Sequence, residues 1–544
     1  MPLALRCWRY IAGQRFAMVE EIPGAPQPEE EGPPKTPRQP GWARTRRNLA
    51  FGYAYTITQT VSTFVTTPVL LAALGAERYG VWVICNALVS YLELMELGFG
   101  NTMTTSLGRF WGAGDKENHN RAASSFLILL SLLGLVGFVV AVGVSPVLGV
   151  MVNVHGSLLS QAKITFLLLA AALSASIPLD LFGSVLIAHQ RFDMLDSSLG
   201  LTVVAQAIGW VVVALAGGGL VDLGLVSAVA SVSGQASRYF LARRAVPELR
   251  ISARLFDRTF VKGATKISRW FIIGETSAVL VQRVDVFLTG LVVGVPAAGT
   301  YAVGQRLVQG GQRLIMPASQ LLLPRASQLS GAGDAKGLEK VALLSSRALV
   351  GMTLPVAVLL MVEAHPLIHL WVGARAPGAA TVVILLAAVL VVKAPFSAVP
   401  GLMMGTGAVR SVVFATLVEG VANVAGTVLL GFYFGIGGVA LASVVAATAA
   451  TTAVLAPRSA RLFGRHFFAV SVGAFLRCLP ASLVAAAGGL GVLWLTGSGA
   501  APLVGSMVAV GLLYVPLFWL LAMDSEERES VLGRLPGRSG RAAG

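Results

Sequence analysis

Charged residues are scarce in this chain: they make up 12% of its 544 residues, while 55% are hydrophobic. A soluble protein of this size is about one quarter charged. Apolar runs of roughly the 18 or more residues that a membrane-spanning helix needs recur from Asn48 to Met523. A membrane β-barrel would instead alternate weakly over segments of about ten residues. The composition therefore excludes a soluble globular protein and predicts an all-α, polytopic membrane protein.

Cysteine and enzyme motifs are also lacking. The three cysteines, Cys7, Cys85 and Cys478, fit no disulfide or metal spacing, and no N-x-[ST] sequon occurs, which favours a bacterial origin. The sequence has no G-x-x-x-x-G-K-[ST], H-E-x-x-H or G-x-S-x-G. We therefore expect no catalytic residue, metal or resident cofactor. Transport would draw on an H⁺ or Na⁺ gradient, the membrane potential or the gradient of the substrate itself.

The hydrophobic pattern predicts about fourteen spans, preceded by a Pro- and Glu-rich segment, 1–46, that has the composition of a disordered tail. The predicted spans are 48–74, 79–107, 123–148, 160–188, 197–217, 220–243, 267–293, 297–323, 343–370, 379–405, 410–433, 438–457, 473–496 and 501–523.

The net charge of +15 is explained by the placement of Lys and Arg between these spans. Most of the 41 basic residues fall in the two termini and in alternate loops, whereas the other loops hold only Arg78, Lys163 and Arg375. Because cytoplasmic loops collect Lys and Arg, both termini are predicted to be cytoplasmic. We therefore expect a multi-pass inner-membrane protein that contacts anionic lipid and binds no nucleic acid.

The longest polar interruption, residues 244–266, separates the first six spans from the rest. A span ending in Gly, a short loop and a Tyr beside a Gly recur on both sides, in "LLAALGAERYGVWVICNAL" and "LTGLVVGVPAAGTYAVGQRL". This repeat is typical of a duplicated transporter. We predict a tail at 1–46, a first half at 47–245, a linker at 246–266, a second half at 267–457, two further helices at 458–523 and a cytoplasmic tail at 524–544.

Opposite charges interrupt the seventh span, "SAVLVQRVDVFLTGLVVG". A charge at a helix centre costs roughly 2.5–3.5 kcal/mol, so these groups must face a cavity or a partner. At 100° per residue, Glu275, Arg283 and Asp285 fall on one half of the helix, but Arg283 and Asp285 diverge by about 160°. They are therefore poor partners for each other.

The eighth span carries a stripe of donors about 120° wide, while its other face is largely aliphatic. Its arginines, two helical turns or about 10 Å apart, suit an anionic ligand rich in oxygen, because guanidinium forks bind phosphate and amides bind sugar hydroxyls. The stripe consists of Gln305, Arg306, Gln309, Gln312 and Arg313. The alternative is structural: these residues pair with Glu275, Asp285 or the acids of the second span.

Other polar groups inside predicted spans are candidates for coupling or for structural pairing. Glu96, like Glu275 and Asp285, could carry a proton or ligate Na⁺. Glu93, Asp180, Arg238, Glu363, Lys393 and Glu419 complete the set. Pro395 and Pro400 are predicted to break the tenth span near Lys393, and broken helices often line transport paths. A simple packing kink is the alternative.

Four stretches together resemble the polysaccharide-biosynthesis flippases of the multidrug/oligosaccharidyl-lipid/polysaccharide exporter superfamily. They are "LLAALGAERYGVWVICNALVSYLELMELGFGN", "VLIAHQRFDMLDSSLG", "QRVDVFLTGLVVGVPAAGTYAVGQRL" and "VANVAGTVLLGFYFGIGGVALASVV", and they sample most of residues 47–456. The resemblance implies two six-helix lobes around a central cavity and two additional C-terminal helices.

The resemblance also implies a substrate: an undecaprenyl-pyrophosphate-linked oligosaccharide or related precursor of lipopolysaccharide or exopolysaccharide. Arg283, Arg306 and Arg313 fit the type and wheel position of the cavity arginines that hold the pyrophosphate or acidic sugars in such flippases. A polysaccharide polymerase and glycosyltransferases are the protein partners it suggests.

Two other functions stay open at this stage. A cation-coupled multidrug exporter of the same superfamily would present acids to its cavity, which the basic seventh and eighth spans disfavour. A scaffold that gathers cell-envelope enzymes without transporting anything would not need its charges inside the membrane.

Overall fold

A computed structural model describes residues 42–93, 99–149, 154–265, 281, 283–320, 322–331, 334–497 and 499–521, and all regular structure in these ranges is helical. Ten helices in this part of the chain are long and apolar enough to cross a membrane. The prediction of an all-α polytopic membrane protein is confirmed. By packing, the described chain forms two compact units, 42–303 and 304–521.

Two of the ten long helices each contain one predicted span and the first part of the next: 48–74 and 79–107 in α2, and 410–433 and 438–457 in α18. Helix α2, Trp42–Leu92, turns at Gly75 (φ 73°), and α18, Val409–Ala450, turns at Gly435 (φ 58°). Both residues adopt positive φ angles, which glycine reaches without the steric cost that a Cβ imposes. The predicted eighth span is a helix, but its Gln and Arg residues make it too polar to count among the ten. Much of the predicted seventh span, residues 267–280 and 282, lies outside the described residues.

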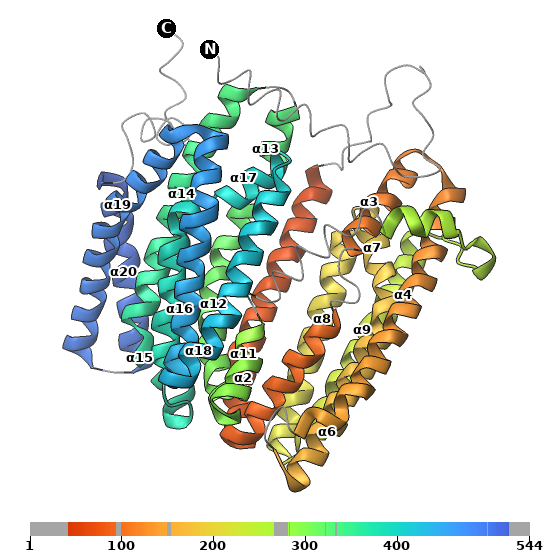
Figure 1. The fold of residues 1–544 in the computed structure, drawn as a ribbon, viewed down its shortest axis with the longest axis horizontal. Coiled ribbons are helices and arrows are strands. Elements are labelled where there is room, and N and C mark those ends of the chain that lie inside the picture. The colour runs from red at the N-terminus through yellow and green to blue at the C-terminus, as the bar shows by residue number, and fades with distance from the viewer. Residues whose placement is uncertain are drawn as a thin grey trace. The chain divides into compact units, whose positions relative to one another are not determined.

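The first unit is a bundle in which α6 and α8 both pack on α9, α4 packs on α6, and α2 packs on α8 (Figure 1). Its core is built around Phe126, Phe182 and Leu130, all nearly inaccessible. Leu201, on α8, is 69% exposed, which is suited to hydrocarbon and not to water. The helices of this unit are α2, α3 (Phe99–Gly112), α4 (Lys116–Val144), η2 (Ser145–Val147), α6 (Gly156–Ser176), η3 (Ile177–Leu179), α7 (Asp180–Ala188), α8 (Phe192–Leu215), α9 (Leu220–Ala245), η4 (Ala253–Leu255), α11 (Val284–Val292) and the first turns of α12 (Val295–Gln320).

In the second unit, α14 packs against α16 and α19, and α19 packs along α20 (Figure 1). Tyr514, on α20, donates a hydrogen bond of 2.7 Å to the carbonyl of Gly351 on α14 and fastens the last helix to the bundle. The helices are the rest of α12, α13 (Leu322–Gly331), α14 (Ala335–Val362), α15 (Ala364–Val372), η5 (Gly373–Arg375), α16 (Ala379–Lys393), η6 (Ala394–Phe396), α17 (Val399–Gly405), α18, η7 (Thr451–Leu455), α19 (Ala456–Thr496) and α20 (Ala500–Leu521).

The division between the two compact units falls inside α12. The reason is close packing of α11 and the first turns of α12 on α2. Gly290 lies against the side chain of Ile84, and Gly299 lies against Tyr79 and the backbone of Gly80. Small residues on these helices allow such close approach.

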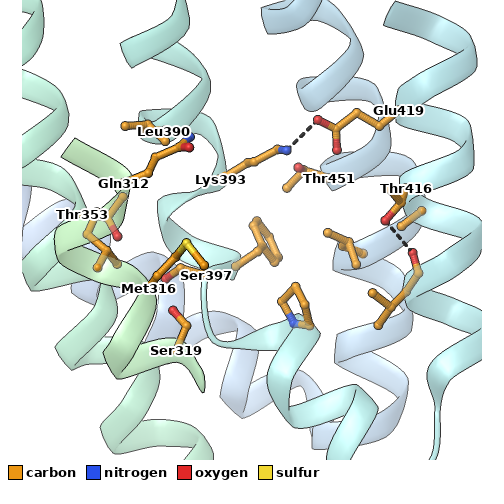
Figure 2. A pocket seen from close by; sticks show the side chains of 16 residues that line it. Gln312, Met316, Ser319, Thr353, Leu390, Lys393, Ser397, Thr416, Glu419 and Thr451 are labelled. Atoms are coloured by element: carbon orange, nitrogen blue, oxygen red, sulfur yellow. Dashed lines mark hydrogen bonds and ion pairs between the residues drawn. The ribbon is translucent and has the colours of Figure 1, made fainter. Parts of the chain in front are cut away.

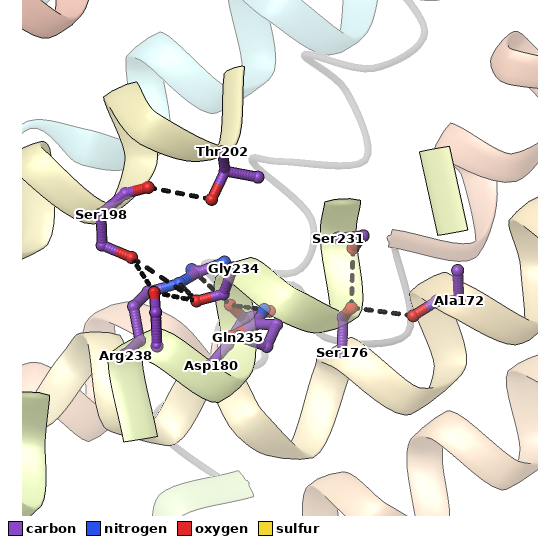
Figure 3. A network of polar contacts seen from close by, with 10 residues as sticks. Ala172, Ser176, Asp180, Ser198, Thr202, Ser231, Gly234, Gln235 and Arg238 are labelled. Atoms are coloured by element: carbon purple, nitrogen blue, oxygen red, sulfur yellow. Dashed lines mark hydrogen bonds and ion pairs between the residues drawn. The ribbon is translucent and has the colours of Figure 1, made fainter. Parts of the chain in front are cut away.

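A polar network joins three helices inside the first unit (Figure 3). The carboxylate of Asp180, at the start of α7, accepts hydrogen bonds from Gln235 at 2.6 Å and from Arg238 at 3.2 Å, both on α9. Gln235 is buried, and the Arg238 side chain is 13% exposed. On α8, the Ser198 hydroxyl lies 2.5 Å from that of Ser237 on α9. The network satisfies polar groups that would be costly to leave unpaired in a membrane.

We expect Asp180→Asn to lower the free energy of unfolding by about 3 kcal/mol, because it leaves the mostly buried Arg238 without its charge partner. Unfolding of the purified protein in detergent measures this loss. The matched control is Lys116→Ala, which breaks an ion pair with Glu248 whose side chains are 62% and 51% exposed. Exposed pairs contribute roughly 0–1 kcal/mol. Equal losses in the two variants would contradict the assignment of the Asp180 network as a structural element.

Candidate functional site

A cavity of ≈ 350 Å³ lies within the second unit, where α16 ends (Figure 2). Its walls come from five helices and two irregular turns, so residues far apart in the sequence surround it. It is lined by Gln312, Ile315, Met316 and Ser319 of α12, Thr353 of α14, Leu390 and Lys393 of α16, Phe396 and Ser397, Pro400 of α17, Val412, Ala415, Thr416 and Glu419 of α18, and Thr451 and Leu455 of η7.

Irregular backbone forms two sides of this cavity. Helix α16 ends at Lys393, the 3₁₀ turn η6 follows with Pro395, and α17 begins with Pro400 in its first turn. The break predicted from these two prolines is therefore confirmed. Its cause is that proline has no backbone N–H with which to continue a helix. On the opposite side, Thr451–Leu455 is a π-helical turn. Such turns are found frequently at functional sites, and irregular backbone at membrane depth is tolerated where it lines a cavity.

An ion pair crosses one edge of the cavity. Figure 2 shows Lys393 reaching from α16 to Glu419 on α18, with Nζ 2.5 Å from Oε1. The Glu419 side chain is 12% exposed and that of Lys393 is 37% exposed. Glu419 lies ten residues into α18, or about 15 Å along the helix, which is half the thickness of the hydrocarbon core. At that depth each charge is costly alone, so the pair stabilises both groups.

Two buried hydroxyls that line the cavity have no hydrogen-bond partner among the described residues. They are Oγ1 of Thr353, 5% exposed, and Oγ1 of Thr451, 2% exposed. A helical threonine can satisfy its hydroxyl on the carbonyl four residues earlier, as Thr416 and Thr452 do at 3.1 Å and 2.7 Å. An unpaired buried hydroxyl costs about 1–3 kcal/mol. Each oxygen has less than 1 Å² of accessible surface, so both residues line the cavity while their hydroxyls stay covered by neighbouring atoms.

The stripe predicted on the eighth span lies on α12, and the structure brings one member of it to this cavity. Gln312 is exposed and lines the wall. Gln305, Arg306, Gln309 and Arg313 are half-buried and are not among the lining residues, and both arginines interact with neighbouring groups. The role of these four residues in binding stays a prediction.

Arg283, in the first unit, forms an ion pair with an acid of the second predicted span. Its Nη1 lies 2.5 Å from Oε2 of Glu93, with both side chains more than 40% exposed. The Tyr91 hydroxyl donates to the carbonyl of Arg283 at 3.5 Å. A half-exposed guanidinium held by one carboxylate keeps donors for a second anion. Binding of substrate by Arg283 stays a prediction.

Asp285, one of the three candidates for ion coupling, is 2% exposed, and its Oδ2 accepts a hydrogen bond of 2.9 Å from the Tyr301 hydroxyl. Arg283 and Asp285 therefore have different partners, as their divergence on the helical wheel predicts. The other two candidates, Glu96 and Glu275, lie outside the described residues. A coupling role for any of the three is untested.

The sequence analysis named Lys393, Glu419 and the two prolines as candidates, but it did not predict that they line one cavity. It did not single out Thr353 or Thr451, because threonine is ordinary in apolar helices. The only available signal was their position: Thr451 follows an alanine-rich stretch of α18, and Thr353 precedes Pro355 in α14. Neither position reveals whether the hydroxyl is bonded within its own helix.

The sequence profile of the family described as "Polysaccharide biosynthesis protein" matches residues 46–330, which is more than half of the chain. The chain belongs to the polysaccharide biosynthesis protein family. None of the curated proteins compared with it matches.

Solved structures similar to this family member are membrane transporters. An inward-facing multidrug resistance MATE transporter of the MOP superfamily has a TM-score of 0.66 and 16% identity, over 76% of this chain and 96% of its own. The lipid II flippase MurJ in an inward closed conformation has a TM-score of 0.64 and 15% identity, over 87% and 98%. A MOP superfamily transporter from Pyrococcus furiosus has a TM-score of 0.54 and 15% identity, over 79% and 94%. At these identities the likeness shows a shared fold.

Proposed function

We propose that this protein moves lipid-linked oligosaccharide or polysaccharide precursors across the bacterial inner membrane by alternating access. The observation that carries the proposal is the cavity at the end of α16, with a charge pair at its edge, in a member of the polysaccharide biosynthesis family. A structural protein gains nothing from a polar cavity of this kind. A transporter needs one, because a hydrophilic headgroup must be bound on its way through hydrocarbon.

In this proposal polar side chains of the protein bind the headgroup, and the lipid tail stays in the bilayer. Arg283, Arg306 and Arg313 neutralise the pyrophosphate of an undecaprenyl-linked glycan, since guanidinium forks match phosphate oxygens. Gln305, Gln309 and Gln312 contact sugar hydroxyls. Protons or Na⁺ provide the driving force through a carboxylate, for which Glu96, Glu275 and Asp285 are the candidates. Both termini face the cytoplasm, where glycosyltransferases assemble the substrate, and a polymerase uses it outside.

The test is charge reversal on α12 in cells that depend on this protein for surface glycan. We expect Arg306→Glu with Arg313→Glu to reduce export at least tenfold, because acidic groups would repel the pyrophosphate that the arginines attract. Surface glycan and the lipid-linked precursor that accumulates inside are measured together. The protein level in the membrane fraction shows whether the variant inserts normally.

The control is Arg250→Glu with Arg254→Glu, which changes the net charge equally at two exposed positions in the first unit. We expect normal export from it. Full export by the stably inserted Arg306/Arg313 variant would contradict the proposal and favour a scaffold. If the wild-type protein exports organic cations and does not translocate the precursor, the result would favour a drug exporter.

A further inference from the structure

Exposed cations gather at one end of the first unit, along the segment that closes α9 and follows it. Residues 243–262 contain six basic residues and two acidic ones, a net charge of +4. All six basic side chains are exposed, and none of them has an ion-pair partner among the described residues. They are Arg243, Arg244, Arg250, Arg254, Arg258 and Lys262.

Both acidic residues of this segment are already engaged elsewhere. Glu248 forms an ion pair of 2.8 Å with Lys116 on α4. Asp257 accepts hydrogen bonds from the backbone N–H groups of Thr259 at 2.8 Å and Phe260 at 3.1 Å, and so caps the helix that begins there. Neither carboxylate neutralises the six cations, so the surface keeps its positive charge.

The backbone that carries these cations is fastened to the first turns of α4. The N–H of Arg250 donates to the side chain of Asn120 at 3.0 Å, and the N–H of Asp257 donates to the hydroxyl of Ser125 at 2.9 Å. Leu249 is fully buried in the core of the unit. Figure 1 shows this segment, in yellow-green, beside the end of α3 and the start of α4. An ordered backbone presents its side chains at a lower entropic cost of binding than a flexible loop.

Exposed phenylalanines stand next to the cations. Phe240, on α9, is 68% exposed and lies one helical turn before Arg243 and Arg244. Phe256, 42% exposed, follows Arg254 by two residues. An exposed phenyl ring suits hydrocarbon, and a guanidinium about 5 Å further along the same helix reaches the phosphates above it. The cations therefore lie at the level of the lipid headgroups.

Charge and aromatic groups together decide the class of partner. A nucleic acid or an acidic protein would engage the arginines and leave Phe256 in water. A bilayer takes both, because its phosphates meet the guanidinium groups while its acyl chains cover the phenyl ring. Anionic headgroups are favoured over zwitterionic ones, since each cation near a negative membrane surface contributes about 1 kcal/mol, or about fivefold in affinity.

We propose that residues 243–262 form a docking surface for anionic phospholipids of the surrounding bilayer. The sequence predicts contact with anionic lipid from the charge of the loops. The inference assigns that contact to one ordered surface, in which the six cations bind headgroup phosphates and Phe256 enters the acyl region. It goes beyond the proposed function, because the bound phospholipid is not the transported substrate.

The experiment measures lipid binding to the purified full-length protein by native mass spectrometry, with phosphatidylglycerol and phosphatidylcholine as probes. We expect phosphatidylglycerol to bind at least tenfold more tightly. Arg250→Gln with Arg254→Gln and Arg258→Gln should lower its affinity at least tenfold and leave phosphatidylcholine binding unchanged. Because the three side chains are exposed, the unfolding midpoint in phosphatidylcholine should also stay unchanged. That result shows that the variant folds.

The matched control is Lys336→Gln with Lys340→Gln and Arg461→Gln. It removes three exposed cations from the second unit and changes the net charge equally. Its affinity for phosphatidylglycerol should fall less than twofold, because the lost charges lie outside the docking surface. Phe256→Ser tests the apolar contact. It should weaken phosphatidylglycerol binding at least threefold and leave the binding of soluble polyphosphate unchanged.

Three results would overturn the inference. The first is equal affinity of the wild-type protein for the two phospholipids, and the second is an equal loss in the two triple variants. The third is tighter binding of another anion through the same three arginines. Soluble polyphosphate or a polyglutamate peptide in that role would assign the surface to a soluble partner, and undecaprenyl phosphate would assign it to the transported lipid. None of these measurements depends on translocation, so the proposed function is tested separately.

Discussion

Lys393→Met should reduce export of lipid-linked glycan at least tenfold and lower the free energy of unfolding by about 2 kcal/mol. The substitution removes a cavity cation and leaves Glu419, 12% exposed, without the partner that lies 2.5 Å away. Breaking a fully buried pair costs about 3–5 kcal/mol. We expect the smaller value because the Lys393 side chain is 37% exposed and can reach water. Precursor accumulation in cells and unfolding of the purified protein measure the two effects.

The double variant Lys393→Met with Glu419→Gln separates stability from transport. It removes both charges, so most of the lost stability should return, because no uncompensated charge remains. Export should stay low, because the cavity still lacks the charged donor and acceptor. Recovery of export together with stability would show that the pair only holds α16 and α18 together. The swapped variant, Lys393→Glu with Glu419→Lys, should regain more stability than export.

Gly80→Ala should destabilise the first unit by roughly 2–3 kcal/mol, near the upper end of the usual cost of overpacking. An added Cβ would collide with the carbonyl oxygen of Val295 and lie 2.8 Å from its carbonyl carbon. Because the obstacle is backbone, a change of rotamer cannot relieve it, and α2 and the start of α12 must move apart. A lower unfolding midpoint of the purified variant and a lower yield in the membrane fraction are the expected results.

Gly200→Ala is the control for this glycine effect. Gly200 lies inside α8 of the same unit, and an added Cβ would meet no described atom within 4 Å. In an open helical position alanine is the better helix former by about 1 kcal/mol. We therefore expect unchanged or slightly higher stability. Similar unfolding midpoints for the two variants would show that α2 does not pack closely against Val295.

Local features of the fold could be predicted from the sequence because they depend on neighbouring residues. Hydropathy over about 20 residues decides whether a helix can cross a bilayer, and Pro395 and Pro400 decide where α16 must stop. The separation of neighbouring spans was predictable too. Gly75 and Gly435 have non-helical backbone angles inside α2 and α18, so each of these labels covers two helices that meet at a glycine, close to the predicted gaps 74–79 and 433–438.

The candidate site was only partly predictable. A helical wheel shows which residues share a face, and it correctly separated Arg283 from Asp285. It does not show what that face meets: Arg283 pairs with Glu93, 190 positions earlier in the chain, and Lys393 pairs with Glu419 on another helix. Four of the five polar residues predicted on the eighth span are not among those that line the cavity in the second unit, whereas Gln312 is.

By itself, the sequence determined that this protein is a helical bundle in a membrane. Hydrophobicity and helix-breaking residues decide this, and both depend only on residues within a few helical turns of each other. Tertiary structure alone decided which charges neutralise each other and which hydroxyls, those of Thr353 and Thr451 among the described residues, are buried without a partner. Those outcomes depend on distances between atoms of different helices. Such distances are set by packing of side chains that lie far apart in sequence, for which no local pattern exists.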